Sequence, residues 1–177
     1  EMCDSDWSSD VCSSDLEKKI LKDLSFSLKR GEKLAIVGQI ASGKSTLLNL
    51  LAGVLKPSEG RILVNGIPVE EISAQSYHER LGYIGQDPIV FSQTIAQNIR
   101  FWREEGQREV ERAAAHAQLI DEIEAFPEGF EERIGQRGVT ISGGQKQRLT
   151  IARAIVDTPE LLVMDDVTAS LDADSEE

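Results

Sequence analysis

Hydrophobic positions change their spacing along this 177-residue chain, and each spacing predicts a different element. Leu24, Phe26 and Leu28 alternate with polar residues, which is the pattern of a strand with one buried face. The apolar run at residues 34–37 predicts a strand that is buried on both faces. Residues 44–55 then place leucines at helical spacing and predict a helix.

The second half of the chain has a long helical pattern between two short strands. Alternation at residues 61–64, followed by Asn65-Gly66, predicts a hairpin, and residues 81–86 predict another short strand. From about residue 94 to 155 apolar residues recur three or four apart, as in amphipathic helices. Residues 160–166, "ELLVMDD", then form a short apolar run that ends on two acids. The order of sheet, helical insertion and sheet predicts one α/β domain, which the chain is long enough to fill.

Composition narrows the function classes. The chain has 19 basic and 31 acidic residues, for a formal net charge of −12. This balance argues against a sequence-independent nucleic-acid binder, which needs a basic face for phosphates. No run approaches the roughly 18 apolar residues that cross a bilayer.

The first sixteen residues differ from the rest. They hold both cysteines, Cys3 and Cys12, together with Trp7 and no basic residue. A secretory signal would begin positive and contain an apolar core, a metal site would need more ligands, and a solvated tail fits the composition. Residues 6–16 resemble most an in-frame translation of a sequencing-library adapter. We therefore expect residues 1–16 to be non-native and the domain to occupy 17–177, with no cysteine.

Residues 38–46, "GQIASGKST", fit the phosphate-loop pattern G-x-x-x-x-G-K-[ST] between a predicted strand and a predicted helix. Backbone N–H groups of such a loop turn around an anion at the positive end of the helix. Lys44 would reach the β and γ phosphates, and the Ser45 hydroxyl would ligate Mg²⁺. The alternative is a glycine-containing turn with a chance lysine. The predicted nucleotide contacts here are Gly38, Gln39, Ala41, Ser42, Gly43, Lys44, Ser45 and Thr46.

Two adjacent acids follow the last predicted strand. Asp165 fits the buried strand-end acid that faces the magnesium of nucleotide hydrolases. The alternative for Asp165, a strand-terminal residue that caps a turn, becomes less favourable beside the phosphate loop.

The stretch "ISGGQKQRLTIARAI" at residues 141–155 resembles the signature motif of ABC transporter ATPases, with Ile141 where Leu is commoner. The phosphate loop, "YIGQDP" with Gln86, and "ASLD" ending at Asp172 occur in the order of that family. The resemblance covers about residue 17 to the end. Residues 87–101 and "IGQRG" at 134–138 resemble the exporter branch.

The resemblance implies a P-loop NTPase core of the α/β class, with a mainly parallel sheet and an N-terminal antiparallel β part. It also implies an inserted α-helical subdomain at about 94–156. ATP and Mg²⁺ are the implied ligands, and Ser45, Gln86 and Asp165 would hold the metal. Two such domains would sandwich two ATP molecules, each chain contacting its partner's nucleotide through Ser142, Gly143, Gly144, Gln145 and Asp172.

Further partners follow from the same resemblance. Gln86 would link the metal site to a membrane-spanning exporter domain, and the chain would work at the cytoplasmic face of the cell's inner membrane. No nucleic-acid partner is expected. Two rival functions remain open, a soluble ABC ATPase of translation or DNA repair and a nucleotide-gated interaction module without turnover. The coding sequence upstream of Glu17 would separate them.

The chain departs from the family at several positions. Ala41 replaces a customary glycine, which is tolerable at negative φ and costly otherwise. The adenine-stacking aromatic belongs upstream of Leu21, and we do not assign Trp7 to that role. The chain ends before the switch histidine, which neither His78 nor His116 can replace because both precede the acid-bearing strand. We therefore expect this fragment to hydrolyse ATP poorly or not at all.

Asp166 stands where the family has the glutamate that polarises the attacking water. Its arm is shorter by one C–C bond, roughly 1.5 Å, and misplacing a catalytic group by about 1 Å can lower a rate on the order of a hundredfold. An aspartate here resembles the degenerate site of heterodimeric exporters. We therefore expect a slow site of its own and a competent site on a partner that its signature completes.

Other polar and aromatic residues have simpler interpretations. Arg148 and Arg153 are expected on the surface or in contacts of the helical segment. His78 and His116 are expected on the surface, and Trp102 is expected to pack within the helical insertion.

Overall fold

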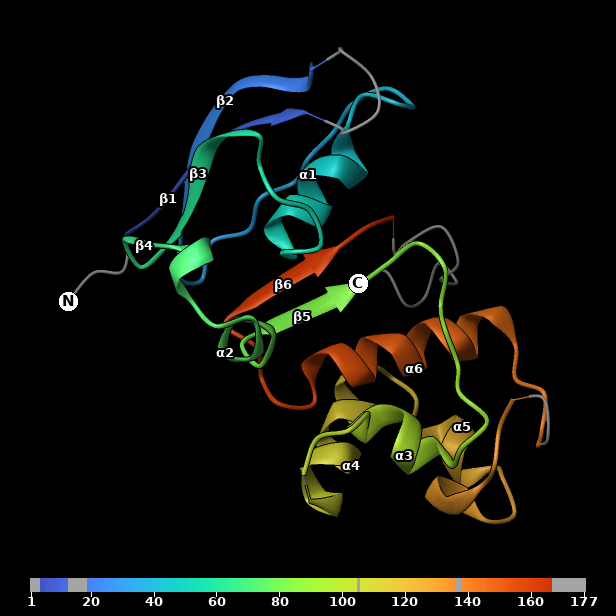
Figure 1. The fold of residues 1–177 in the computed structure, drawn as a ribbon. Helices are drawn as coiled ribbons and strands as arrows, with labels where there is room; N and C mark the ends of the chain where they lie inside the picture. The colour runs from blue at the N-terminus through green and yellow to red at the C-terminus, as the bar shows by residue number, and fades with distance from the viewer. Residues whose placement is uncertain (1–3, 13–18, 105, 136–137, 167–177) are drawn as a thin grey trace. The chain divides into compact units, whose positions relative to one another are not determined.

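The computed structural model describes residues 4–12, 19–104, 106–135 and 138–166. The chain divides into two compact units between Arg80 and Leu81 (Figure 1). The first unit contains an antiparallel sheet and helix α1, and the second contains a parallel strand pair and most of the helices.

The first unit is built on a sheet with the strand order β2-β1-β3-β4. Its strands are β1 (Asp4–Cys12), β2 (Lys19–Lys29), β3 (Glu59–Val64) and β4 (Ile67–Pro68), and all pairs are antiparallel. This confirms the predicted N-terminal antiparallel part. Strand β1 lies within residues 1–16, whose non-native origin stays a prediction.

Strand β2 contains the predicted half-buried strand. Leu24, Phe26 and Leu28 are half-buried, whereas the serines between them are exposed. The β3–β4 hairpin turns at Asn65 and Gly66, with φ of 53° and 78°, because a two-residue turn of this kind needs positive φ at both positions. The hairpin prediction is therefore confirmed.

The strand predicted at residues 34–37 is wrong. These residues have no regular secondary structure, and the side chains of Leu34 and Val37 are 48% and 93% exposed. No described strand pairs with them, so their apolar side chains have no sheet face to pack against. An apolar run alone cannot identify the strand that will pair with it.

Helix α1 (Lys44–Leu51) and helix α2 (Ala74–His78) complete the first unit, with a short 3₁₀ turn η1 (Val69–Glu71) between the hairpin and α2. Ser73 caps α2 by accepting a hydrogen bond from Ser76 N–H. The buried side chains of this unit include residues of both helices and of β3: Leu47, Leu50, Leu51, Ile62 and Tyr77.

The strands of the second unit are β5 (Leu81–Ile84) and β6 (Leu161–Met164), which pair in parallel. Leu81 lies opposite Leu161, and Ile84 lies opposite Met164. Both strands were predicted, and β5 ends two residues earlier than its pattern indicated.

The helices of the second unit lie between residues 95 and 155, inside the segment predicted to be helical. They are α3 (Ile95–Arg100), α4 (Gln107–His116), α5 (Ile120–Glu124) and α6 (Gly143–Ile155), with a 3₁₀ turn η2 at Gly129–Glu131.

Helix α6 lies between the strand pair and the other helices of its unit, in contact with β5 on one side and with α3 and α4 on the other (Figure 1). The apolar cluster between the helices includes the fully buried Ile99, Val110, Ile123 and Leu149. Among the described helices, none combines the length and apolar character needed to cross a membrane.

Candidate nucleotide site

The predicted phosphate loop leads directly into α1. Gly43 is the residue that caps this helix, with φ of 91°, a conformation that favours glycine. A Cβ at Gly43 would lie 2.9 Å from the side chains of Ile20 and Leu21 at the start of β2. The backbone conformation therefore favours glycine at this position, and a Cβ would also require these two side chains to shift.

The Lys44 side chain is hydrogen-bonded to the backbone of the predicted phosphate loop. Its Nζ donates hydrogen bonds to Gly38 O and Gln39 O, each at 2.9 Å. The ammonium therefore lies against the loop carbonyls at the positive end of α1, whose first turn carries no acidic residue. A lysine and helix N–H groups at one place favour an anion.

An open hollow of about 270 Å³ lies against this loop, lined by Ile20 and residues 41–46. Its lining includes the lysine, the three hydroxyl side chains of Ser42, Ser45 and Thr46, and the loop backbone. The chemistry of this donor set fits a polyphosphate.

Ala41 has a positive φ, which is the unfavourable one of the two backbone conformations considered for it from the sequence. Its φ is 63°, in the left-handed region, where an L residue with a Cβ loses roughly 1–2 kcal/mol. Ser42 N–H donates to Gln39 O at 3.2 Å, so the strained residue lies within a hydrogen-bonded turn.

Gln86, Asp165 and Asp166 follow the carboxyl ends of β5 and β6. Asp165 N–H donates to Ile84 O at 2.9 Å and so extends the pairing beyond β6. The strands are parallel neighbours, so Gln86 and Asp165 come to the same edge of the pair, where ligands bind in open α/β sheets. Desolvation, and then the charge of Asp165, raise the pKa of Tyr83 on β5.

Asp166 is exposed and has a φ of 50°. Aspartate is enriched several-fold among the non-glycine residues that adopt this left-handed conformation. The backbone therefore supplies a reason for a short acid at this position that is independent of catalysis.

The predicted signature begins helix α6. Ser142 is the residue that caps the helix, and Gly143 and Gly144 are its first residues. A Cβ at Gly143 would meet nothing within 4 Å, so this end of the helix is open. Its first N–H groups have the geometry of an anion-binding helix terminus.

The predicted site residues therefore form one group at residues 38–46 in the first unit and two groups in the second. The second unit holds Gln86 with Asp165 and Asp166 at the strand ends, and residues 142–145 at the start of α6. Asp172 lies outside the described residues.

Each unit is considered by itself for groups that could hold a magnesium ion. Within the described part of the chain, no three His, Cys, Asp or Glu side chains gather closely enough to hold a metal. Mg²⁺ is usually bound by one or two carboxylates, waters and substrate phosphates, rather than by an all-protein cage. In the first unit Ser45 carries a hydroxyl, and in the second unit Asp165 carries a carboxylate, both of which are oxygen donors of the kind that Mg²⁺ takes.

The predictions for the two arginines and the two histidines are confirmed, and the prediction for Trp102 is wrong. Arg148 forms an ion pair with Glu122, and Arg153 bonds within the helical segment. His78 and His116 are exposed. Trp102 is 82% exposed, however, because it follows α3 in a left-handed conformation with φ of 69° that turns it out of the cluster. Its neighbour Phe101 packs instead, with its ring stacked on Phe91 at 5.1 Å.

Sequence reasoning missed the bonding partners of the signature and of α3. Ser142 and Gln145 match the capping pattern S/T-x-x-E/Q, as do Thr94 and Gln97 at α3. The two capping boxes could therefore have been predicted from this spacing in the sequence. Asn98 is fully buried in α3, and no pattern in the sequence marked it.

The comparisons with known proteins agree with this geometry. The family model described as ABC transporter matches residues 21–169. The ABC multidrug transporter mdr2 of Aspergillus fumigatus is 40% identical over 157 residues, which cover 89% of this chain and 20% of that protein. The mitochondrial iron-sulfur clusters transporter atm1 of the same organism is 43% identical over 162 residues, 91% of this chain and 22% of that protein.

A solved structure of a bacterial Atm1-family ABC exporter with ATP bound is also similar. It superposes with a TM-score of 0.90 at 37% identity, over 99% of this chain and 31% of the exporter chain. The chain therefore has the P-loop NTPase fold and belongs to the ABC transporter family. It spans about a fifth of the length of the two curated relatives, at 20% and 22%.

Proposed function

We propose that this chain is the ATP-binding domain of an ABC exporter, which binds MgATP and drives transport through ATP-dependent pairing with a second such domain. The observation that carries the proposal is the lysine-bearing loop at the start of α1. Lys44 lies among the loop carbonyls at 2.9 Å from each of two oxygens, beside a hollow lined by residues 41–46. Family membership and similarity to an exporter solved with ATP support the same function.

Within the site, loop N–H groups and Lys44 bind the β and γ phosphates. On binding, Lys44 exchanges the carbonyls of Gly38 and Gln39 for phosphate oxygens, which are stronger partners because they are charged. Ser45, Gln86 and Asp165 are the proposed holders of the magnesium ion, which neutralises charge on the phosphates. The other loop residues that contact the bound phosphates are Gly38, Gln39, Ala41, Ser42, Gly43 and Thr46.

A second set of site residues acts when two such domains pair. Ser142, Gly143 and Gly144 bind the γ-phosphate of nucleotide held by the partner domain, through helix N–H groups and the helix dipole. Asp172 also belongs to this contact. A membrane-spanning exporter domain contacts this chain near Gln86 and responds to the pairing of the two ATP-binding domains. The chain therefore works at the cytoplasmic face of the inner membrane.

Catalysis in this chain's own site is slow. Asp166 occupies the water-activating position with a side chain shortened by roughly 1.5 Å, so general-base geometry is weakened more than binding. The competent site then belongs to a partner with glutamate, in a heterodimer. The proposed domain comprises residues 17–177, with its helical subdomain at about 94–156.

The binding proposal is tested with the whole protein and the variant Lys44→Met. We expect MgATP affinity to fall by at least about a hundredfold, because charged hydrogen bonds to two phosphates are lost. Lys33→Met, in an exposed lysine before the loop, is the matched control and should bind as the wild type does. Equal affinity in the Lys44 variant and the wild type would exclude this loop as the phosphate site.

The transport proposal is tested by the coding sequence upstream of Glu17. An exporter of this kind predicts about six apolar spans there, each of roughly 20 residues. A soluble upstream domain would instead favour the ABC ATPases of translation or DNA repair.

A further inference from the structure

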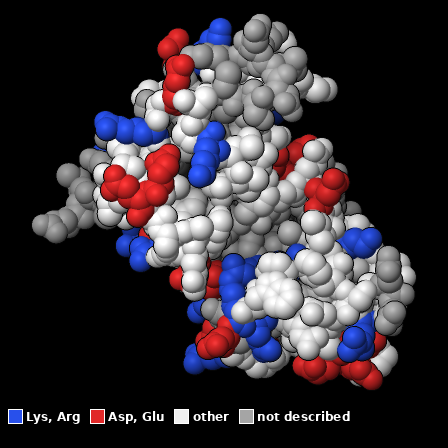
Figure 2. Space-filling view, in the orientation of Figure 1, with Lys and Arg blue, Asp and Glu red and all other residues white. Residues whose placement is uncertain are grey.

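Gln147 of α6 is buried inside the second unit, with 1% of its surface exposed. Charged side chains are spread over the visible surface in Figure 2, whereas Gln147 is a neutral amide in the interior. Within the described part of the chain, neither its Nε2 nor its Oε1 has a hydrogen-bond partner. Glu122, Arg148 and Asp157 also have a buried atom without a partner, but each forms an ion pair through another atom. An amide that is bonded at neither end costs free energy and requires an explanation.

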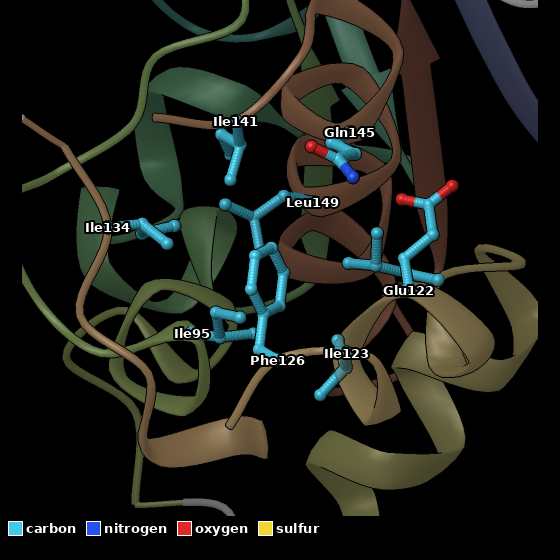
Figure 3. A pocket seen from close by; sticks show the side chains of 9 residues that line it. Ile95, Glu122, Ile123, Phe126, Ile134, Ile141, Gln145 and Leu149 are labelled. Atoms are coloured by element: carbon cyan, nitrogen blue, oxygen red, sulfur yellow. The ribbon is translucent and has the colours of Figure 1, made fainter. Parts of the chain in front are cut away.

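The spacing of residues in α6 places Gln147 on the face that packs against β5. Gln147, Ile151 and Ala154 are four and three residues apart, so they share one face of the helix. Ile84 of β5 forms a buried cluster with Ala154, and Ile151 packs against it. Leu149 points the other way, into a small apolar cavity that α6 shares with α3 and α5 (Figure 3). The Gln147 amide therefore lies on the strand side of α6.

Two contacts show that α6 runs opposite to β5. A Cβ at Gly82 would lie 2.5 Å from Ala154 O, so Gly82 lies beside the last turn of the helix. Ile84 is two residues further along the strand, and its cluster includes Ile151, which is three residues earlier in the helix. Residues further along β5 therefore lie beside residues earlier in α6.

The same direction continues beyond the end of β5. Gln147 is one helical turn before Ile151, a distance of about 6 Å along the helix. Gln86 follows Ile84 by two residues, a distance of about 7 Å in extended backbone. The geometry therefore places Gln147 at the level of residues 85–87, which have no regular secondary structure.

Another part of the segment after β5 is already held by a buried amide. Asn98 of α3 is fully buried, and its carboxamide bonds the backbone of Phe91 at both ends. Phe91 N–H donates to Asn98 Oδ1, and Asn98 Nδ2 donates to Phe91 O, each at 2.9 Å. Gln147 carries the same donor and acceptor on α6. A buried carboxamide in a helix is thus one means by which this unit fixes the irregular segment.

We propose that Gln147 is a positioning residue for Gln86. When Gln86 binds the magnesium ion of MgATP, the Gln147 carboxamide donates to a backbone carbonyl and accepts from a backbone N–H of residues 85–87. These bonds fix the segment that carries Gln86 and join it to α6. The inference rests on the proposed function, in which Gln86 is a holder of the metal, and it deepens that function by naming the side chain that supports Gln86.

The test measures the affinity of the whole protein for MgATP by isothermal titration calorimetry, in the wild type and in Gln147→Met. Methionine keeps a side chain of similar length and removes both polar atoms. We expect the affinity to fall by roughly fivefold to tenfold, the size that one or two neutral hydrogen bonds contribute. The affinity for ATP in the presence of EDTA should be unchanged, because Gln86 acts through the magnesium ion. Equal losses with and without magnesium would overturn the proposal.

The unfolding midpoint without nucleotide shows whether the amide is bonded before ATP binds. Because Gln147→Met replaces an unpaired buried amide by an apolar group, the midpoint should stay the same or rise. MgATP should then raise the midpoint less in the variant than in the wild type. A midpoint that falls without nucleotide would mean that the amide is already bonded, which contradicts the proposed role.

Thr150 provides the matched control on the same helix. It is also buried, and its hydroxyl donates to Lys146 O at 3.0 Å, within α6 itself. Thr150→Val removes this polar group with little change of shape and should leave the MgATP affinity unchanged. If Thr150→Val and Gln147→Met lower the affinity equally, any change inside α6 weakens binding and Gln147 has no special role.

A double-mutant cycle with Gln86→Ala tests the connection between the two glutamines. In that background Gln147→Met should lower the MgATP affinity by less than about twofold, because the residue that it positions is gone. If the two losses multiply, Gln147 acts independently of Gln86 and the positioning role is wrong. Equal binding by the wild type and Gln147→Met would also reject this role, while the proposed function stands. A wild type that does not bind MgATP would overturn the proposed function itself, and this inference with it.

Discussion

Arg153 of α6 is bonded to Asn98 of α3 through both the backbone and the side chain of the asparagine. Arg153 Nε donates to Asn98 O at 2.8 Å, and Nη2 donates to Asn98 Oδ1 at 3.0 Å. Asn98 Oδ1 also accepts from Phe91 N–H at 2.9 Å. The pair therefore joins the segment after Gln86 to the helix that begins with the signature.

The surroundings of Arg153 reinforce this junction. Its Nη1 donates to Ile89 O at 2.8 Å, and its guanidinium lies 5.2 and 5.1 Å from the ring centroids of Phe91 and Phe101. Burial, and then the nearby charge of Arg103, lower the pKa of Arg153 to about 10, which leaves it charged at neutral pH. A planar guanidinium satisfies these directions together, which a lysine ammonium cannot do.

Replacing Arg153 with lysine should therefore destabilise the protein although the charge is kept. We expect the free energy of unfolding to fall by about 2–3 kcal/mol, because buried acceptors lose charged donors and the ring contact is lost. Urea denaturation measures this change. Arg108→Lys, in an exposed arginine of α4, is the control and should change stability by less than about 0.5 kcal/mol. A tolerated Arg153→Lys would mean that the fork geometry is unimportant.

Replacing Ala41 with glycine should stabilise the phosphate loop. Ala41 has φ of 63°, and removal of its Cβ relieves strain of roughly 1–2 kcal/mol, which the greater freedom of glycine in the unfolded chain partly offsets. A net gain of about 0.5–1 kcal/mol in denaturant unfolding is expected. The control Ala74→Gly, in helical backbone at α2, should shift stability in the opposite direction. A loss of stability in both variants would contradict the strain at Ala41.

Tyr77 links α2 to α1, since its hydroxyl donates to Leu51 O in the buried part of the first unit. Tyr77→Phe leaves that carbonyl without this donor and should lower stability by about 1–2 kcal/mol at neutral pH. Denaturation of the two proteins in parallel measures the difference.

The same tyrosine predicts an alkaline dependence of stability. Burial raises the pKa of Tyr77 from 10.0 to about 12, so the folded state favours the neutral phenol. The resulting stability is fully present below pH 10 and is lost as pH rises from 10 towards 12. Tyr77→Phe should lack this loss. If both proteins lose stability equally across that range, the alkaline transition arises elsewhere.

Most of the fold could be predicted because its patterns are local. Asn65-Gly66 specifies its hairpin, and the acids after β6 mark the end of a parallel strand. The strand prediction at residues 34–37 was wrong for the opposite reason. A buried strand depends on partner strands elsewhere in the chain, which its own residues do not specify. The prediction that Trp102 packs was wrong because the backbone turns into a left-handed conformation after α3, and the pattern of hydrophobic residues does not predict that turn.

The candidate site divides in the same way. The loop at 38–46 and the signature could be found from spacing, since the chemistry fixes which residue stands where. The conformation of Ala41 and the Arg153–Asn98 junction depend on tertiary packing. Asp166 combines both kinds of information, because its identity is visible in sequence and its left-handed φ of 50° is not.

We propose that this chain binds ATP but hydrolyses it slowly in its own site, and single-site turnover by the whole protein tests this proposal. The wild type, assembled alone as a homodimer, should turn over MgATP slowly. Asp166→Glu should raise that rate by up to about a hundredfold, as the carboxylate gains the reach that it lacks. Asp166→Asn, which tolerates the same backbone conformation without a carboxylate, should not raise it. Brisk hydrolysis by the wild-type homodimer would contradict the claim.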